Sequence, residues 1–379
     1  MSLARDIADL GSVTTRLDTV GGSSGALSNR SLIINGAQNV NQRGNQTGLT
    51  ANAYGTDRFN FTLTGRDELV YNLAQNTDVP SGYGFANSLS FQATTAESAI
   101  AADEYFFISH RIEAQNLQHL AYGTSSAKKV TLSFWVKSSV TGTFCIGLYK
   151  ADNTAQVHNK TYTINSASTW EQKTITFEAN TLSGGAIDDD NGLGLYVTWH
   201  LAAGSNFDSG SSTSSGWANY STTNWCEPST TDAVITTTNA TFLLTGVQLE
   251  VGDTATDFEH RSYGDELARC QRYCIDLTPD SGTSPYFPGT GACANTTVAV
   301  THMAFPVQMR ATPSLSFSSA GDYRIYNGST HTVTAIGING MSPVGGGVNF
   351  SVASSMGTTQ AVGVYATGTG IRSLVVAEL

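Results

Sequence analysis

Alternation of apolar and polar residues dominates the middle of the chain. The clearest case is KVTLSFWVK at residues 129–137, where Val130, Leu132, Phe134 and Val136 point one way and the intervening residues the other. This pattern predicts a strand with one face in a core. Comparable segments lie at 105–112, 143–149, 160–164, 171–177, 192–199 and 240–251, separated by clusters of Gly, Asn, Asp and Ser. So many short, punctuated strands favour a β-sandwich over residues 58–262.

The N-terminal part of the chain has a different pattern. Leu3, Leu10 and Leu17 are spaced seven apart, which predicts a short helix that either pairs with copies of itself or is an ordinary amphipathic helix. Residues 31–57 are polar and rich in Gly and Asn, so we expect an extended arm more than a domain. An arm that cannot bury enough surface to order itself commonly docks onto a partner, so residues 1–57 are predicted to be an attachment element.

The C-terminal part begins with the segment GDELARCQRYCI at residues 264–275. It predicts a helix with Cys270 and Cys274 on one face. Short β-type segments punctuated by Gly and Pro then run from residue 297 to residue 377. We therefore expect residues 263–379 to form a linker helix and a second, smaller β-domain, and the whole chain to be all-β.

Composition and charge exclude several classes of function. Charged residues make up 13% of the chain and the formal net charge is -11, so no basic surface for nucleic acid is expected. No apolar run reaches the roughly 20 residues that span a bilayer, and the N-terminus lacks the apolar core of a secretory signal. We expect a protein made in a cytoplasm, without membrane insertion. Its five cysteines, an odd number, are predicted to be free thiols.

The candidate binding residues lie in a long polar excursion at residues 202–232. It carries Trp217, Tyr220 and Trp225, whose rings could stack on the faces of sugars. The same rings could instead only fix the loop to the sandwich. Sequence alone leaves both interpretations open.

No pattern of catalytic or metal-binding residues stands out. Cys270 and Cys274, with His260 nearby, lack the second pair of ligands that zinc sites use, so packing is the preferred interpretation. The cluster Asp188 to Asn191 suits either calcium or a turn before a strand. No GxSxG or HExxH motif occurs, and acidic residues are sparse on the predicted strands. We therefore predict no enzyme activity, no catalytic residues, no bound metal and no cofactor.

Four segments carry a resemblance to a known family: LIINGAQNVNQRG at 32–44, VTLSFWVKSS at 130–139, NGLGLYVTWHLAAGSNF at 191–207 and FLLTGVQLEVGDTATDFEHRSYGDELARCQRYC at 242–274. They resemble tail fibre-type structural proteins of marine and other tailed bacteriophages, over roughly the first three quarters of the chain. The resemblance implies a central jelly roll like that of carbohydrate-binding modules. It also implies an N-terminal region that faces the virion and a variable C-terminal domain that faces the host.

The function expected from these features is a tail fibre in the virion, made in the cytoplasm of the host. The N-terminal arm would attach to other tail proteins, and the chain, as a homotrimer, would adhere to a glycan or protein of the host cell surface. We expect recognition after Cys274, in the Gly-rich segment 337–350, with the 202–232 loop as the second candidate. Two alternatives stay open. One is a head fibre, decoration or tail adaptor protein, and the other is a tailspike that depolymerises polysaccharide.

Overall fold

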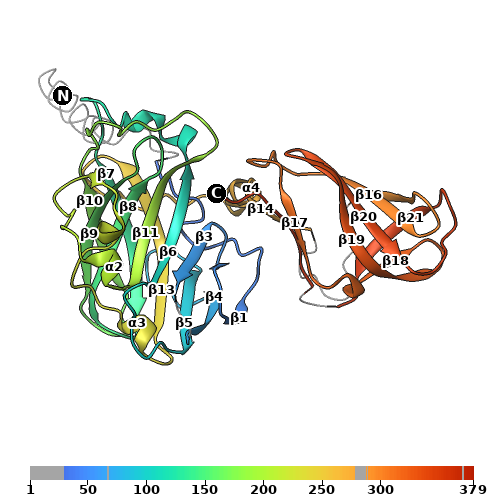
Figure 1. Cartoon of the computed structure of the whole chain (residues 1–379), viewed down its shortest axis with the longest axis horizontal. Coiled ribbons are helices and arrows are strands. Elements are labelled where there is room, and N and C mark those ends of the chain that lie inside the picture. Colours follow the sequence, from blue (N-terminus) through green and yellow to red (C-terminus); the bar gives the residue numbers. More distant parts are fainter. Residues whose placement is uncertain (1–29, 66–67, 278–286, 288, 369–370) are drawn as a thin grey trace, which may run out of the picture. The chain divides into compact units, whose positions relative to one another are not determined.

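The computed structural model describes residues 30–65, 68–277, 287, 289–368 and 371–379. The predicted N-terminal helix and its heptad lie outside these residues. The chain divides into two compact units. The described residues of the first unit lie within 30–39, 45–55 and 59–261, and those of the second lie within 40–44, 56–58 and 262–379. Figure 1 colours the chain along its sequence.

The first unit is a sandwich of two antiparallel sheets. In spatial order, the six-stranded sheet consists of β1 (Gln46–Leu49), β4 (Val70–Asn76), β5 (Ser88–Thr95), β13 (Thr241–Val251), β7 (Val130–Ser138) and β10 (Glu171–Phe177). The seven-stranded sheet consists of β12 (Ala218–Asn219), β9 (Gln156–Ile164), β8 (Gly142–Lys150), β11 (Leu193–Ala203), β6 (Tyr105–Glu113), β3 (Phe59–Thr64) and β2 (Ala53–Tyr54). Consecutive strands often change sheet, as in a jelly roll.

The core of this unit lies between the two sheets. The predicted inward side of β7 is fully buried, and Phe134 packs edge-on against Trp199 of β11 with the ring centroids 5.8 Å apart. Short helices fill the connections: η1 (Ala114–Leu120), α2 (Ser205–Asp208), η2 (Thr222–Asn224) and α3 (Ala233–Thr236). Two of these, with β12, give the 202–232 excursion regular structure that its polar composition did not predict.

The second unit is a smaller β-domain. A closed barrel consists of β15 (Thr290–Cys293), β16 (Val298–Ala304), β20 (Gly345–Val352), β19 (Thr330–Ser342), β18 (Tyr323–Tyr326) and β21 (Ala361–Ala366). A three-stranded sheet consists of β14 (Cys274–Asp276), β22 (Ser373–Val376) and β17 (Ser314–Phe317), and the helices are α4 (Tyr263–Gln271) and η3 (Ala320–Asp322). The prediction of an all-β chain with a jelly-roll sandwich and a smaller C-terminal β-domain is confirmed.

The predicted helix over 264–275 is shorter in the structure. It ends at Gln271, and Cys274 already belongs to β14, where Ile275 pairs with Val375. The expectation of both cysteines on one helical face is therefore wrong, because tertiary pairing of a β-branched residue overrides the local helical pattern. Cys270 and Cys274 are both buried, and burial raises the pKa of each thiol. No helix among the described residues has the length and apolar character needed to cross a bilayer.

Residues 30–57 contain more regular structure than an extended arm. Strands β1 and β2 lie within this range and pair with β4 and β3. Ile33 and Val40 are fully buried although the surrounding sequence is polar. Residues 30–57 therefore include paired strands and buried side chains. The division of the chain into an attachment arm, a sandwich and a C-terminal domain stays a prediction.

Candidate functional site: an aromatic groove on the sandwich

The outer face of the seven-stranded sheet carries a row of large side chains. In β6, alternation places Phe106 and Ile108 in the core and turns Tyr105, Phe107 and Arg111 to the opposite face. The antiparallel register continues the row across the sheet. Tyr196 of β11 stands opposite Arg111 on one side and opposite Tyr149 of β8 on the other. Residues from strands far apart in sequence thus become neighbours on one surface.

The rings in this row contact one another. The centroids of Tyr149 and Tyr196 are 5.5 Å apart at an angle of 32°. Tyr149 also meets Tyr220 at 5.3 Å and Trp225 at 5.3 Å, both nearly perpendicular. Edge-to-face pairs at such separations are favourable for aromatic rings. The contacts fix the orientation of the tyrosines before any ligand arrives.

The 202–232 excursion supplies the second wall. Its backbone is tied to the sheet where the amide of Tyr220 donates to the carbonyl of Ala155 at 2.8 Å. Ser221 and Asn224 form a capping box around η2, which places Trp225 at the end of that turn. The amide of Cys226 then donates to the carbonyl of Phe207 at 2.9 Å. Several fixed points therefore hold this loop on the sandwich.

The outer face of the sheet and the 202–232 loop form the two walls of an open groove of about 330 Å³. Beneath it, Trp225 packs edge-on against Phe107 at 5.4 Å and against the buried His200 at 5.3 Å. Tyr220 is 36% exposed, whereas Trp225 is only 8% exposed. The groove is lined by Thr62, Tyr105, Phe107, Arg111, Tyr149, Ala151, Leu193, Tyr196, Phe207, Tyr220 and Trp225.

The hydroxyls of Tyr149 and Tyr220 are neutral hydrogen-bonding groups. Burial raises the pKa of Tyr149, and neighbouring Tyr196 raises it further. Burial likewise raises the pKa of Tyr220, with smaller contributions from Tyr149 and Tyr105. A phenol whose pKa lies above 10 stays protonated at neutral pH and both donates and accepts a hydrogen bond. The groove therefore offers flat apolar faces together with several hydroxyl groups.

The structure separates the three residues singled out from the sequence. Tyr220 and Trp225 line the groove, but Trp217 does not. Trp217 packs edge-on against Tyr122 with the centroids 5.5 Å apart, and its Nε1 donates to the carbonyl of Glu178 at 2.7 Å. Its surroundings fit the interpretation that a ring fixes the loop to the sandwich.

The different surroundings of Trp217 and Tyr220 predict different effects of substitution. Trp217→Phe should lower the free energy of unfolding by about 2 kcal/mol, because it removes a buried hydrogen bond and part of a ring. It should leave ligand affinity unchanged at a temperature where the protein is folded. Tyr220→Ala should have the opposite pattern. Its urea unfolding midpoint should lie near that of the natural chain, and its affinity for the ligand should be weaker. Urea unfolding followed by tryptophan fluorescence measures the first effect, and equal losses of stability in both variants would contradict this assignment.

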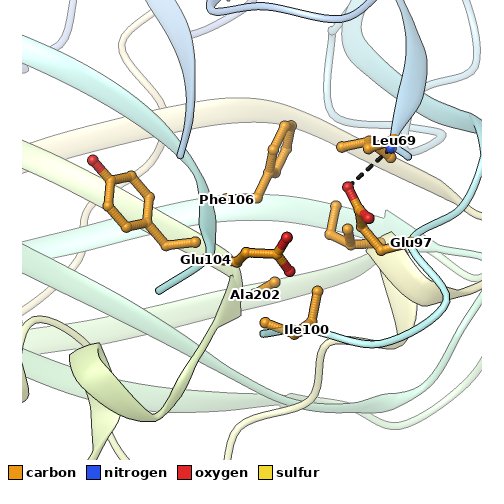
Figure 2. A pocket seen from close by; sticks show the side chains of 8 residues that line it. Leu69, Glu97, Ile100, Glu104, Phe106 and Ala202 are labelled. Atoms are coloured by element: carbon orange, nitrogen blue, oxygen red, sulfur yellow. Dashed lines mark hydrogen bonds between the residues drawn. The ribbon is translucent and has the colours of Figure 1, made fainter. Parts of the chain in front are cut away.

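Two buried carboxylates face a separate small cavity of the first unit (Figure 2). Oε1 of Glu97 accepts a hydrogen bond from the amide of Leu69 at 2.9 Å, and Oε2 of Glu104 accepts one from the amide of Ala101 at 2.8 Å. Carboxylate pairs perform glycoside hydrolysis in many enzymes. This cavity measures about 10 Å³, which is the space of a single water and far too small for a sugar. The carboxylates of Glu97 and Glu104 therefore hold the backbone amides of Leu69 and Ala101 in place.

The side chains of the acidic turn Asp188 to Asn191 form local hydrogen bonds. Oδ1 of Asp190 accepts a hydrogen bond from the amide of Gly192 at 2.8 Å, and Oδ1 of Asp188 accepts one from Nδ2 of Asn153 at 3.2 Å. The ammonium of Lys150 lies close by, where it donates to the carbonyls of Gly184 and Ala186. Within the described part of the chain, no group of three or more His, Cys, Asp or Glu side chains is placed to hold a metal ion.

Sequence reasoning missed Tyr105, Tyr149 and Tyr196 as candidates. All three lie in segments that were predicted as strands, at positions on the side away from the core. Tyrosines at outward positions of three separate strands indicate that aromatic rings could gather on one face of a sheet. It becomes specific only when strand order is known, because the order β8, β11, β6 is what brings the three together.

Comparisons with known proteins give structural likenesses only. No family model matches the chain, and no curated protein matches it. A putative sugar binding protein from Bacteroides thetaiotaomicron shares 10% identity over 59% of this chain and 100% of its own, with a TM-score of 0.30. The family 11 carbohydrate-binding module of the cellulase Lic26A-Cel5E from Clostridium thermocellum shares 13% identity over 58% of this chain and 98% of its own, with a TM-score of 0.27.

A viral structure is among these likenesses. The enzymatically active domain of tailspike protein 4 from bacteriophage CBA120 shares 11% identity over 54% of this chain, with a TM-score of 0.29. The chain spans only 21% of the length of that tailspike domain. At such TM-scores the likenesses carry no functional weight, so the residues of the groove have to support any proposal.

Proposed function

We propose that this chain is an adhesive component of a tailed-phage virion that binds a surface glycan of the host in the aromatic groove of its first unit. The groove is the observation that carries the proposal. Rings of Tyr149 and Tyr196 offer apolar faces for the C–H faces of sugar rings, and the phenol hydroxyls match sugar hydroxyls. A volume of about 330 Å³ falls in the range of small-molecule sites and suits a short stretch of a saccharide chain that stays partly in solvent.

Binding without hydrolysis is part of the proposal. Hydrolysis of a glycosidic bond requires two carboxyl groups on opposite sides of that bond. Among the residues that the structure describes, those lining the groove include no Asp or Glu, so they do not supply the pair of carboxyl groups that this reaction uses. This composition favours adhesion over depolymerisation as the role of the groove.

The virion location and the trimer rest on sequence. The family resemblance of residues 32–44 and 242–274 supports a tail fibre that attaches by its N-terminal part to other tail proteins. The leucine heptad at Leu3, Leu10 and Leu17 supports a homotrimer. Three copies would convert weak single-site affinity into firm adhesion through effective concentration. Placing the glycan site on the sandwich moves the expected recognition surface from the second unit to the first.

Affinity electrophoresis in gels that contain a polysaccharide tests this proposal. The panel consists of bacterial capsule and lipopolysaccharide preparations together with alginate, polygalacturonate, hyaluronan, xylan and mixed-linkage glucan. We expect at least one of them to retard the natural chain. Tyr149→Ala and Tyr196→Ala should each weaken binding about tenfold, equivalent to about 1.4 kcal/mol, through loss of a stacking face.

Tyr83→Ala is the matched control, because Tyr83 is 52% exposed in the same unit but does not line the groove. It should migrate as the natural chain does. The proposal fails if no polysaccharide retards the chain, or if the two groove variants bind as tightly as the control.

A further inference from the structure

Three aromatic rings form a corner of the groove where β6 begins. Tyr105 of β6 stands perpendicular to Phe207 of α2, with the ring centroids 4.8 Å apart at an angle of 89°. Tyr105 also contacts Phe107, with the centroids 5.4 Å apart at 31°. All three residues line the groove; Phe107 is buried, and the other two are partly exposed. We call Tyr105, Phe107 and Phe207 the apolar corner.

Backbone hydrogen bonds fix the apolar corner before any ligand arrives. The amide of Gly204 donates to the carbonyl of Glu104 at 2.7 Å, and the amide of Asn206 donates to the carbonyl of Ala102 at 3.0 Å. Both donors belong to the turn that carries Phe207, and both acceptors come just before β6 in the sequence. The two walls of the corner are therefore held against each other by the backbone.

The shape of the corner differs from that of the tyrosine pair Tyr149 and Tyr196, which we call the platform. The two rings of the platform lie at 32° to each other, so together they present a broad face on which a sugar ring can stack. The rings of Tyr105 and Phe207 are perpendicular and present no such shared face. They enclose an angle, which suits a small group that contacts both rings at once.

The side chains at the corner favour an apolar group. Phe107 and Phe207 have no polar side-chain atoms. Thr62 stands opposite Phe107 in the register of β3 and β6, and it donates its hydroxyl proton to Oδ1 of Asn60 at 2.5 Å. A hydroxyl placed against the two phenylalanines would lose hydrogen bonds to water, whereas a methyl group gains free energy by leaving water. A methyl group therefore suits the corner better than a hydroxyl.

The corner and the platform lie far enough apart to contact different sugar residues. On β6, Tyr105 lies six residues before Arg111, which is the residue opposite Tyr196 in the antiparallel register. Six strand residues extend over roughly 20 Å. A ligand that reaches both the corner and the platform must therefore contain more than one sugar ring.

We propose that the groove selects acetylated saccharide chains, with the methyl of an acetyl group in the apolar corner and another sugar residue of the same chain on the platform. The inference rests on the proposed function and adds the class of ligand to it. Acetyl esters and acetamides both present this methyl group, so the test distinguishes them. A chain without acetyl groups would keep the stacking on Tyr149 and Tyr196 and lose the contact at the corner.

The test compares acetylated saccharides with matched forms that lack the acetyl group. Acetylated xylan, acetylated alginate and the capsule preparations are used in affinity electrophoresis before and after mild alkali, which removes acetyl esters and keeps the backbone. For acetamides, chitin and cellulose oligosaccharides of equal length, which share the same linkage, compete with the polysaccharide that retards the chain. In at least one comparison, we expect the acetylated form to bind about fourfold more tightly, as burial of one methyl group predicts.

Variants separate the corner from the platform. Phe207→Ala removes one wall of the corner and should bring the ratio of the two affinities close to one. Tyr149→Ala and Tyr196→Ala should weaken the binding of both forms by a similar factor and keep a ratio of about four. Tyr83→Ala, the matched control outside the groove, should keep both affinities. Thermal unfolding verifies that Phe207→Ala stays folded; should it unfold, Tyr105→Ala removes the other wall and carries the comparison.

The outcomes distinguish failure of the inference from failure of the proposed function. A natural chain that binds both forms equally in every comparison overturns the inference, and so does a preference that persists in Phe207→Ala. A panel in which only saccharides without acetyl groups bind overturns it as well. In these three cases the proposed function stands as long as binding depends on Tyr149 and Tyr196. If none of the saccharides binds, or binding ignores both tyrosines, the proposed function fails and the inference fails with it.

Discussion

Replacing Glu378 by Gln is expected to destabilise the second unit by about 4 kcal/mol. Its carboxylate is bound by two arginines of that unit, Arg43 at 2.9 Å and Arg58. The side chains of all three are at most 9% exposed. Arg43 keeps a longer contact of 4.0 Å with Asp57 in the variant, but breaking a buried ion pair by removing one partner typically costs about 3–5 kcal/mol.

Several other contacts depend on this cluster. The guanidinium carbon of Arg58 lies 3.4 Å from the ring centroid of Tyr273, and the residue has a φ of 75°, in the left-handed region. A non-glycine residue holds that conformation only when its surroundings stabilise it. Arg310 donates to the backbone carbonyls of Ala377 and Glu378, which fixes the end of the chain in the same place.

The measurement must report on the second unit. All five tryptophans lie in the first unit, so their fluorescence follows the unfolding of the first unit. Hydrogen exchange at the amides of β14 and β22 follows the second, and we expect exchange there to accelerate by about a thousandfold in Glu378→Gln. The control is Glu178→Gln, which breaks an exposed ion pair with Lys129 and should change neither signal. Unchanged exchange in β14 would show that the ion pair adds no stability.

Acidification should destabilise the first unit between pH 6.5 and pH 4. Burial lowers the pKa of His200 to about 3. Burial, with Lys160 as the second cause, lowers the pKa of His158 to about 4. In the folded protein both rings therefore stay neutral in this window, whereas in the unfolded chain they bind protons below about pH 6.5. The unfolded state then binds more protons, so stability rises with pH and is lost as pH falls.

The geometry of His158 explains why its neutral form is favoured. Nδ1 is 2.8 Å from the carbonyl of Thr213, so it is the donor, and Nε2 accepts a hydrogen bond from the amide of Glu178 at 3.2 Å. A proton on Nε2 would face that amide hydrogen. Each unit of pKa shift corresponds to about 1.4 kcal/mol. As the pH falls from 6.5 to 4, each histidine should therefore lower the free energy of unfolding of the first unit by about 3 kcal/mol.

Urea unfolding followed by tryptophan fluorescence across this pH range tests the prediction. His158→Gln should remove about half of the pH dependence of the unfolding free energy, because His200 still supplies the other half, although the variant lowers the unfolding free energy at pH 7. His331→Gln, in the second unit, is the control and should leave that dependence unchanged. An unfolding free energy that stays constant from pH 6.5 to pH 4 would mean that these histidines are not held neutral.

Local sequence patterns were sufficient for the strands and insufficient for the groove. Val130, Leu132 and Phe134 alternate with polar residues in a single segment, so periodicity alone identifies β7 and its buried side. Tyr105, Tyr149 and Tyr196 lie more than forty residues apart, and only the strand order makes them neighbours. Composition highlighted the aromatic residues of one loop but could not tell that Trp217 packs inward while Tyr220 lines the groove.

The second unit shows a similar limit. Its segment 337–350 was expected to present variable Gly-rich turns for recognition. In the structure, most of it belongs to the paired strands β19 and β20, and Ile338 and Val344 are strongly exposed there. A Gly-rich sequence of this kind suits either an irregular loop or a hairpin, and the pairing of the two adjacent strands β19 and β20 decides between them.

Binding of the fluorescently labelled chain to bacterial cells that display a polysaccharide which retards it in the gels tests the central claim most directly. Saturation binding would be measured for the natural chain, for a Tyr149→Ala, Tyr196→Ala double variant, and for Tyr83→Ala as the control. We predict that the double variant loses at least tenfold in apparent affinity, whereas the control matches the natural chain. A double variant that binds these cells as tightly as the natural chain would show that adhesion does not depend on the aromatic groove.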